Sequence, residues 1–401
     1  AFAWCQTHAP LRAQAWLLQD WRTYIYITLR RCQNMWTIWK EELCKMISRK
    51  IVWLGIFLLL AFVTVRLYEE RYHYTTIIDG RIYQGQEAIV KDKALTKDYC
   101  GALTLEKVNK IYKNYGFFYY NEESSEPAGN YCSRFVTENF TYFRQTDVYD
   151  PNQIHFYKGK EWEYNAQYLL DNEVRFDYVY GWNDFAEMYV AAILALFVIL
   201  LLGLSPVFAE EYQLKTADIL LTTRRGKGSG IWMKILAALC FAVVLTLGVC
   251  AYMWSIYLVI YGVQGLNASA ILLSFVTPFG YCPESVLGFL LYITFLGFIG
   301  ALLLTGIAMG ISALCKSPFL ALILSVSIYF FPVVWVKVLA PMWIFGAYAK
   351  KISHFMTSMP VYLPMSTGFA FSTEQMALHV CIALAVGIGG MYLGYHRFRR
   401  C

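Results

Sequence analysis

The sequence predicts an all-α polytopic membrane protein of six transmembrane helices with an inserted extracellular domain of mixed α/β, mainly helical structure. Of the 401 residues, 58% are apolar and only 15% are charged, whereas soluble globular chains carry about 25% charged residues. Six apolar stretches approach or exceed the length of about 20 residues that crosses the hydrocarbon core of a bilayer. Between the first two stretches lies a polar, tyrosine-rich insert, residues 68–187.

The expected spans cover residues 51–67, 188–208, 235–261, 285–312, 319–339 and 376–395. The first span is the shortest, because the uninterrupted apolar run from Ile51 to Val65 reaches only about 23 Å at about 1.5 Å per residue. Arg66 is therefore expected to extend its charged end toward the membrane interface.

The segments beside the spans have patterns of their own. Residues 35–50 place apolar side chains at helical spacing between charged ones, which predicts an amphipathic connector helix on the inner interface. Residues 340–375 form an external loop of aromatic-belt composition, in which we expect an interfacial helix. Residues 1–34 are interpreted as a loosely ordered cytoplasmic leader or as an upstream extension of the gene model, and no function is assigned to them.

Within the insert, one helix is predicted over residues 103–116. Leu105, Val108 and Ile111 recur there at helical spacing, and they follow Thr104, a residue type that caps helix N-termini.

Two cysteines of the insert, Cys100 and Cys132, are candidates for a disulfide, because an external compartment is oxidising. Cys282, in the second external loop, is an alternative partner, and spacing alone does not decide between them. The sequence has no CxxC pair, so neither a metal site nor a redox site is predicted.

Orientation follows from Lys and Arg, which are enriched in cytoplasmic loops. The insert has 20 Asp and Glu against 13 Lys and Arg, a net charge of −7. We therefore expect a cell-membrane protein with an external insert, both termini in the cytoplasm and its basic clusters against anionic lipid; nothing predicts nucleic-acid binding. The basic clusters before the first span, between the second and third spans and after the last span comprise Lys40, Lys45, Arg49, Lys50, Lys215, Arg224, Arg225, Lys227, Lys234, Arg397, Arg399 and Arg400.

The cytoplasmic segment 209–234 contains the most informative polar stretch, EEYQLKTADILLTTRRGKG from Glu210 to Gly228. Acids near its start and cations near its end suit the dipole of one short amphipathic helix. A solvated hairpin would have no need of Ile219, Leu220 and Leu221 on a cytoplasmic surface, so we favour a helix that docks on a partner.

Glycines are spaced for close helix packing in the later spans. Gly306 and Gly310 form one GxxxG pattern, and Gly390 and Gly394 form another. Such patterns let two helices approach closely in lipid, either within one chain or between two chains.

The sequence lacks the motifs of an independent enzyme. It has no G-x-x-x-x-G-K-[ST] phosphate-binding loop, no HExxH and no GxSxG, and no span has a central acid that would predict an ion or proton relay. We expect no catalytic residue, metal or cofactor on this chain, so energy for any transport must come from a partner.

Segments in three regions, the connector, the insert and the stretch after the second span, together resemble the type-two ABC transporter permeases (ABC-2 type membrane subunits) of Firmicutes, over a stretch from Met35 to the C-terminus. MWTIWKEELCKMISRKIVW resembles the connector of that family and its first span. GQEAIVKDKALTKDYCGALTLEKVNKIYKNYG and FDYVYGWNDFAEMY are similar to clostridial external domains. VFAEEYQLKTADILLTTRRGKGSGIWMKI resembles the segment between spans two and three.

The resemblance implies a permease that pairs with a second permease chain, as a homo- or heterodimer, and with cytoplasmic ABC ATPase subunits that hydrolyse the ATP. It places Glu210, Glu211, Thr216 and Asp218 on a coupling helix that docks on the ATPase. It places a basic turn nearest the lipid head groups, comprising Arg224, Arg225 and Lys227. The 34-residue leader departs from the family pattern, and the external domain varies too much in size to indicate the cargo.

The function expected from these observations is export of an amphipathic substrate: a peptide, a lipid or a hydrophobic drug. The alternative is a membrane sensor that detects extracellular peptide antibiotics and signals to a two-component kinase. Uncharged, aromatic-rich spans suit amphipathic cargo better than ions.

Overall fold

The structure is a computed structural model. It describes residues 35–120, 127–141, 152, 154–157, 166–223, 226–274, 276, 283–342, 346, 348–368 and 371–400. The expected leader, residues 1–34, lies outside the described residues.

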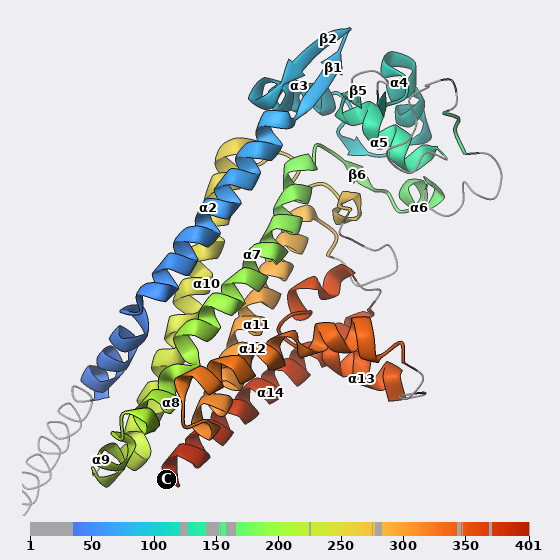
Figure 1. The fold of residues 1–401 in the computed structure, drawn as a ribbon. Coiled ribbons are helices and arrows are strands. Elements are labelled where there is room, and N and C mark those ends of the chain that lie inside the picture. The colour runs from blue at the N-terminus through green and yellow to red at the C-terminus, as the bar shows by residue number, and fades with distance from the viewer. Residues whose placement is uncertain are drawn as a thin grey trace, which may run out of the picture.

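In the part of the chain that the structure describes, six helices are long and apolar enough to cross a membrane, which confirms the predicted fold class. The helices lie side by side in one bundle (Figure 1). Three of them are extended at one end: α7 by α8 (Pro206–Gln213), α10 by a π-helical turn (Gly226–Gly230) and α12 by another π-helical turn (Trp335–Leu339). The spanning helices are α2 (Lys50–His73), α7 (Tyr180–Leu204), α10 (Ile231–Tyr261), α11 (Val286–Leu314), α12 (Pro318–Val334) and α14 (Thr373–Arg399).

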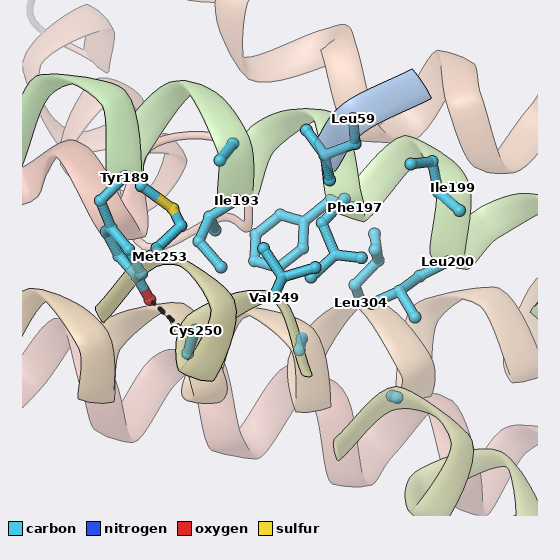
Figure 2. Close-up of a cluster of buried hydrophobic side chains, with 14 of the residues drawn as sticks. Leu59, Tyr189, Ile193, Phe197, Ile199, Leu200, Val249, Cys250, Met253 and Leu304 are labelled. Carbon is cyan, nitrogen blue, oxygen red and sulfur yellow. Dashed lines mark hydrogen bonds between the residues drawn. The ribbon is translucent and has the colours of Figure 1, made fainter. Parts of the chain in front are cut away.

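Helix α7 lies at the centre of the bundle. Figure 2 shows its side chains Tyr189, Ile193 and Phe197 against residues of α2, α10 and α11, such as Leu59 and Leu304. The three α7 side chains are fully buried. Because lipid is as apolar as these side chains, close packing rather than water exclusion holds them together.

The glycine patterns of α11 and α14 pack against each other within the chain. A Cβ on Gly306 would overlap the carbonyl group of Gly387, and a Cβ on Gly390 would overlap that of Gly306. The two backbones therefore approach too closely for any side chain. This contact decides between the alternatives left open by the sequence, because both GxxxG faces are used inside one chain.

The insert is mixed α/β and mainly helical, as predicted. Its described residues form three two-stranded antiparallel sheets, which pair β1 with β2, β3 with β6 and β4 with β5. Its own apolar core includes Val108, Ile111, Phe140 and Phe176. The elements are β1 (Thr75–Ile78), β2 (Arg81–Gln84), α3 (Gly85–Lys97), β3 (Gly101–Ala102), α4 (Leu105–Tyr115), β4 (Tyr119–Tyr120), β5 (Pro127–Ala128), α5 (Tyr131–Phe140), α6 (Ala166–Asp171) and β6 (Arg175–Phe176).

Helix α4 confirms the helix predicted over residues 103–116, with its N-cap. The Thr104 side chain accepts a hydrogen bond from the amide of Lys107. Val108 and Ile111 are buried as expected, whereas Leu105 points toward solvent. The loop 340–375 contains a helix, α13 (Tyr348–Met356), and its location at the membrane interface stays a prediction.

Asp92 of α3 organises the part of the insert nearest the bundle. Its buried carboxylate accepts hydrogen bonds from the hydroxyls of Tyr74 (2.6 Å) and Thr76 (2.9 Å) and from the amide of Tyr131 (3.3 Å). Burial raises the pKa of this carboxyl above its ordinary value, although the three hydrogen bonds oppose the shift. One side chain thereby joins the end of α2 to β1, α3 and α5.

The insert is also tied to the end of α10. The ammonium of Lys93 donates to the carbonyl of Tyr261, the last residue of α10, which satisfies an orphan group at the helix C-terminus. Gln264 donates from its amide to the carbonyl of Lys93 at 3.1 Å and to the carboxylate of Asp177 at 3.1 Å. These contacts fix α3 against the bundle.

Cys100 and Cys132 are free thiols in this structure. Both lie beside Thr96: Cys100 donates to its carbonyl at 3.4 Å, and the Cys132 sulfur is 3.7 Å from its hydroxyl. The alternative partner, Cys282, lies outside the described residues. The disulfide between Cys100 and Cys132 is therefore not formed here and stays a prediction for oxidised protein.

Candidate functional site

The polar segment after α7 folds into two short helices, where the sequence predicted one. Helix α8 ends at Gln213, the chain turns at Lys215 with a left-handed φ of 56°, and α9 covers Ala217–Thr222. A left-handed residue breaks the helical hydrogen-bond pattern, which explains the difference. A π-helical turn, Gly226–Gly230, then leads into α10.

The beginning of α8 is anchored to α11. The hydroxyl of Ser312 accepts hydrogen bonds from the amides of Phe208 (2.9 Å) and Ala209 (3.1 Å), which have no partner within the helix. The end of α14 packs on the same helix, where the ring of Phe398 lies 4.7 Å from that of Phe208. The chain's last helix therefore supports the segment, and Figure 1 shows the C-terminus beside α8 and α9.

A buried group of charges lies where α8, the start of α10 and the connector helix meet. The ammonium of Lys234, in the first turn of α10, donates to Glu211 of α8 at 2.8 Å and to Glu42 of the connector helix at 2.7 Å. The connector helix covers residues 35–47. The side chains of Lys234, Glu211 and Glu42 are only 6%, 9% and 12% exposed. Charges taken out of water need such partners, because an isolated buried charge is strongly unfavourable.

Further contacts extend this group, which we call the Lys234 cluster: Glu42, Lys45, Glu211, Thr216 and Lys234. Lys45 lies 3.1 Å from Glu42 and 3.3 Å from Glu211, and Thr216 donates its hydroxyl to Glu211. The cluster joins the connector helix, α8, the turn before α9 and α10.

Beside the cluster, Arg49 donates to the carboxylate of Glu210 in an ion pair. This pair is a second link between the end of the connector and α8.

The predicted coupling residues therefore have different environments. Glu211 is buried in the Lys234 cluster, Thr216 donates to it, and Glu210 is partly exposed in its ion pair with Arg49. Asp218 is exposed on α9, in its first turn. The structure thus brings Glu211 and Thr216 together and leaves Asp218 apart from them.

The outer surface of α9 is apolar as well as acidic. Ile219 is 68% exposed and Leu214, in the preceding turn, is 64% exposed, while Ala217 and Leu221 on the opposite face are buried. We call Leu214, Asp218 and Ile219 the α9 face. Lys227 of the predicted basic turn is exposed, whereas Arg224 and Arg225 lie outside the described residues.

In the sequence, Lys234, Glu42 and Lys45 appear only as parts of basic or amphipathic segments, so their ion pairs were not predicted. One pattern could have singled out Lys234, because it is the only charged residue in the apolar start of α10, IWMKILAAL. Glu42 and Lys45 carry no comparable sign, since their role depends on a partner far away in the chain.

Comparison with known protein families identifies the family of the chain. Residues 36–400 match the sequence model of the family described as ABC-2 family transporter protein. The chain belongs to this family. As an ABC-2 family member it is a multi-pass membrane protein and the permease subunit of an ABC transporter, a role that implies partnership with ABC ATPase subunits. A comparison with curated proteins found no match for this ABC-2 permease.

Proposed function

We propose that this permease exports an amphipathic substrate across the cell membrane, and that α9 receives the force of ATP hydrolysis by docking on a cytoplasmic ABC ATPase subunit. The chain itself hydrolyses nothing in this proposal. The observation that carries this proposal is the exposed α9 face, which is connected to the buried Lys234 cluster through Thr216.

The distribution of charge supports a cytoplasmic location for α9 and both termini. Basic residues of the connector, of the segment between α8 and α10 and of the end of α14 belong to the end of the bundle that carries α9 (Figure 1). The insert, at the opposite end, has a net charge of −7. Lys and Arg are enriched on the cytoplasmic side of membranes, which supports this orientation. In the same arrangement Arg224, Arg225 and Lys227 would contact lipid head groups.

The α9 face has the properties of a docking surface. Leu214 and Ile219 are more than half exposed at an end of the bundle where water, not lipid, is expected. Exposed apolar side chains around a charged residue mark contact surfaces for partner proteins. Asp218 adds a charge that a basic residue of the ATPase could match.

The Lys234 cluster supplies a route from the docking surface to the spans. A displacement of α9 acts on α8 through the short turn at Lys215, and Glu211 of α8 is joined by Lys234 to α10 and to the connector helix through Glu42. Buried ion pairs resist separation, since breaking one leaves an uncompensated charge. We therefore assign Glu211 and Thr216 to transmission of the movement, and Asp218 to contact with the ATPase.

The outer surfaces of the spans support the substrate assignment. The spans present mainly apolar side chains outward, including Phe57 of α2 and Phe319 of α12. A second permease chain, identical or different, would complete the passage through one of these faces. A peptide, lipid or hydrophobic drug suits such walls better than an ion.

Copurification tests the docking surface. The permease is co-expressed with its ABC ATPase subunit, and the ATPase retained on the tagged permease is measured. Asp218→Lys and Ile219→Glu should each lower retention at least about tenfold, which corresponds to about 1.4 kcal/mol of binding free energy. Glu106→Lys, a charge reversal on exposed α4, is the matched control. Unchanged retention in the Asp218→Lys, Ile219→Glu double variant would refute docking through α9.

A further inference from the structure

We infer that a cavity between the insert and α7 binds an amphipathic organic cation, a molecule with an apolar body and an ammonium or guanidinium group. The cavity has a volume of about 540 Å³, within the range of about 300–1,000 Å³ typical of ligand pockets. The inference rests on the proposed function for the external location of the insert, and it deepens that function by naming the charge of the cargo.

Two structural units form the walls. Helix α5 of the insert contributes Tyr131, Phe135 and Asn139, and the first two turns of α7 contribute Tyr180 and Asn183. Leu272 and Ser274, from the connection after α10, close the third side. A molecule bound here would contact the insert and the bundle at once.

The charges of the cavity leave one carboxylate without a cation. Arg134 and Glu138, both of α5, pair with each other at 2.8 Å. Glu187 of α7 accepts from Asn183 at 3.2 Å and from Ser274 at 3.1 Å, both neutral donors. Among the residues described by the structure, no Lys or Arg forms a salt bridge with Glu187.

The site therefore favours a cation and disfavours an anion. Arg134, Glu138 and Glu187 sum to a net charge of −1 in the cavity, and the insert as a whole is acidic. A surrounding field of one sign concentrates ligands of the opposite sign. Tyr131 and Tyr180 also line the cavity, and tyrosine rings attract an ammonium or guanidinium.

A neighbouring cavity extends the site and adds apolar side chains to it. Its volume is about 250 Å³, and it shares Phe135 and Leu272 with the first cavity. Leu169 and Ile271 line its far part. Both cavities also share Glu138, Asn139 and Ser274, so the joined site offers carboxylates beside apolar side chains, which suits a molecule with a charged head and an apolar tail.

Binding can be measured on the full-length permease without any ATPase. The protein is placed in lipid nanodiscs, and its intrinsic fluorescence is titrated with octylammonium, octanoate and octanol. Wild type should show saturable binding of octylammonium alone. Glu187→Gln should weaken that binding at least tenfold, whereas Glu106→Gln, an exposed control far from the cavity, should leave it unchanged. Glu187 is itself exposed, so its replacement should not affect folding.

Partition into lipid is the same for all variants, so the difference between wild type and Glu187→Gln isolates the protein site. Absence of saturable octylammonium binding, equal binding of octanoate, or unchanged affinity in Glu187→Gln would each overturn the inference. Because no ATPase is present, such a failure would leave docking through α9 untouched. Loss of docking in the copurification experiment would equally leave this cavity untouched.

Discussion

The ammonium of Lys234 lies 2.7 Å from a carboxylate oxygen of Glu42, although 192 positions separate the two residues in the chain. The same ammonium lies 2.8 Å from Glu211. One buried cation thereby neutralises two acids from two other segments, at the point where α8, α10 and the connector helix meet. Removing this cation should lower the stability of the permease and weaken the coupling between α9 and the spans.

Lys234→Met should destabilise the permease strongly, because it leaves Glu42 and Glu211 with only the half-exposed Lys45 as a cationic partner. Breaking a buried ion pair costs about 3–5 kcal/mol. Lys45→Met is the matched control: its side chain is 55% exposed, and exposed pairs contribute about 1 kcal/mol or less. Thermal unfolding of both variants in the same detergent measures the difference. Equal melting temperatures for Lys234→Met and Lys45→Met would show that the buried Lys234 ion pairs do not stabilise the fold.

Gly390→Ala should separate α11 from α14, since a Cβ at this position would overlap the backbone carbonyl of Gly306. The neighbouring Gly389→Ala is the control, because a Cβ there meets no atom within 4 Å and alanine favours helix by about 1 kcal/mol over glycine. We expect a lower melting temperature for Gly390→Ala and an unchanged or higher one for Gly389→Ala. The opposite order would contradict the intrachain packing of the two glycine patterns.

Asp92 should make the insert less stable as pH rises above about 4, the ordinary pKa of an aspartate. Burial raises the pKa of this carboxyl in the folded protein, so the folded state holds a proton that the unfolded state has released. Unfolding then releases a proton, and stability falls as pH increases above that value.

Asp92→Asn, which has no ionisable group, should flatten that pH dependence. Asp79→Asn, on the exposed β1–β2 turn, should retain it. Hydrogen exchange of α3 and α5 amides at several pH values, corrected for intrinsic rates, provides the measurement. A pH profile in Asp92→Asn identical to that of wild type would exclude Asp92 as its source.

Cys100 should react slowly with alkylating reagents at about pH 8, where an unperturbed thiol has a substantial thiolate fraction. Cys100, like Cys44, is an exposed residue, but desolvation of its thiol and the nearby Asp177, which accepts its hydrogen bond at 3.1 Å, raise the pKa of Cys100 to about 12. Asp177→Asn should speed alkylation, and the exposed Cys44 provides an internal reference. Peptide mass mapping measures alkylation at both cysteines. Without reductant, the same mapping would reveal a Cys100–Cys132 disulfide as one cross-linked peptide. Rapid alkylation of Cys100 in wild type would contradict the prediction.

Much of the architecture could be predicted because its causes are local in the sequence. The bilayer imposes one length on every span, so apolar runs such as that preceding Arg66 indicate helices without knowledge of their neighbours. The cap of α4 by Thr104 depends on residues three apart, and the acidic composition of the insert is a property of one segment. The prediction of one coupling helix was wrong at Lys215, where a turn separates α8 from α9, because the residue type lysine does not indicate a left-handed backbone.

The sequence by itself thus determined the spanning helices, the mixed insert and the resemblance of the segment around Glu210 to a coupling region. Tertiary structure alone decided that Glu211 is buried while Asp218 is exposed, that Gly390 packs on Gly306, and that α5 and α7 enclose a cavity beside Glu187. The physical reason is the range of the interactions. Helix formation and membrane insertion depend on neighbouring residues, whereas the pairing of a buried charge, the approach of two backbones and the shape of a cavity depend on segments that only folding brings together.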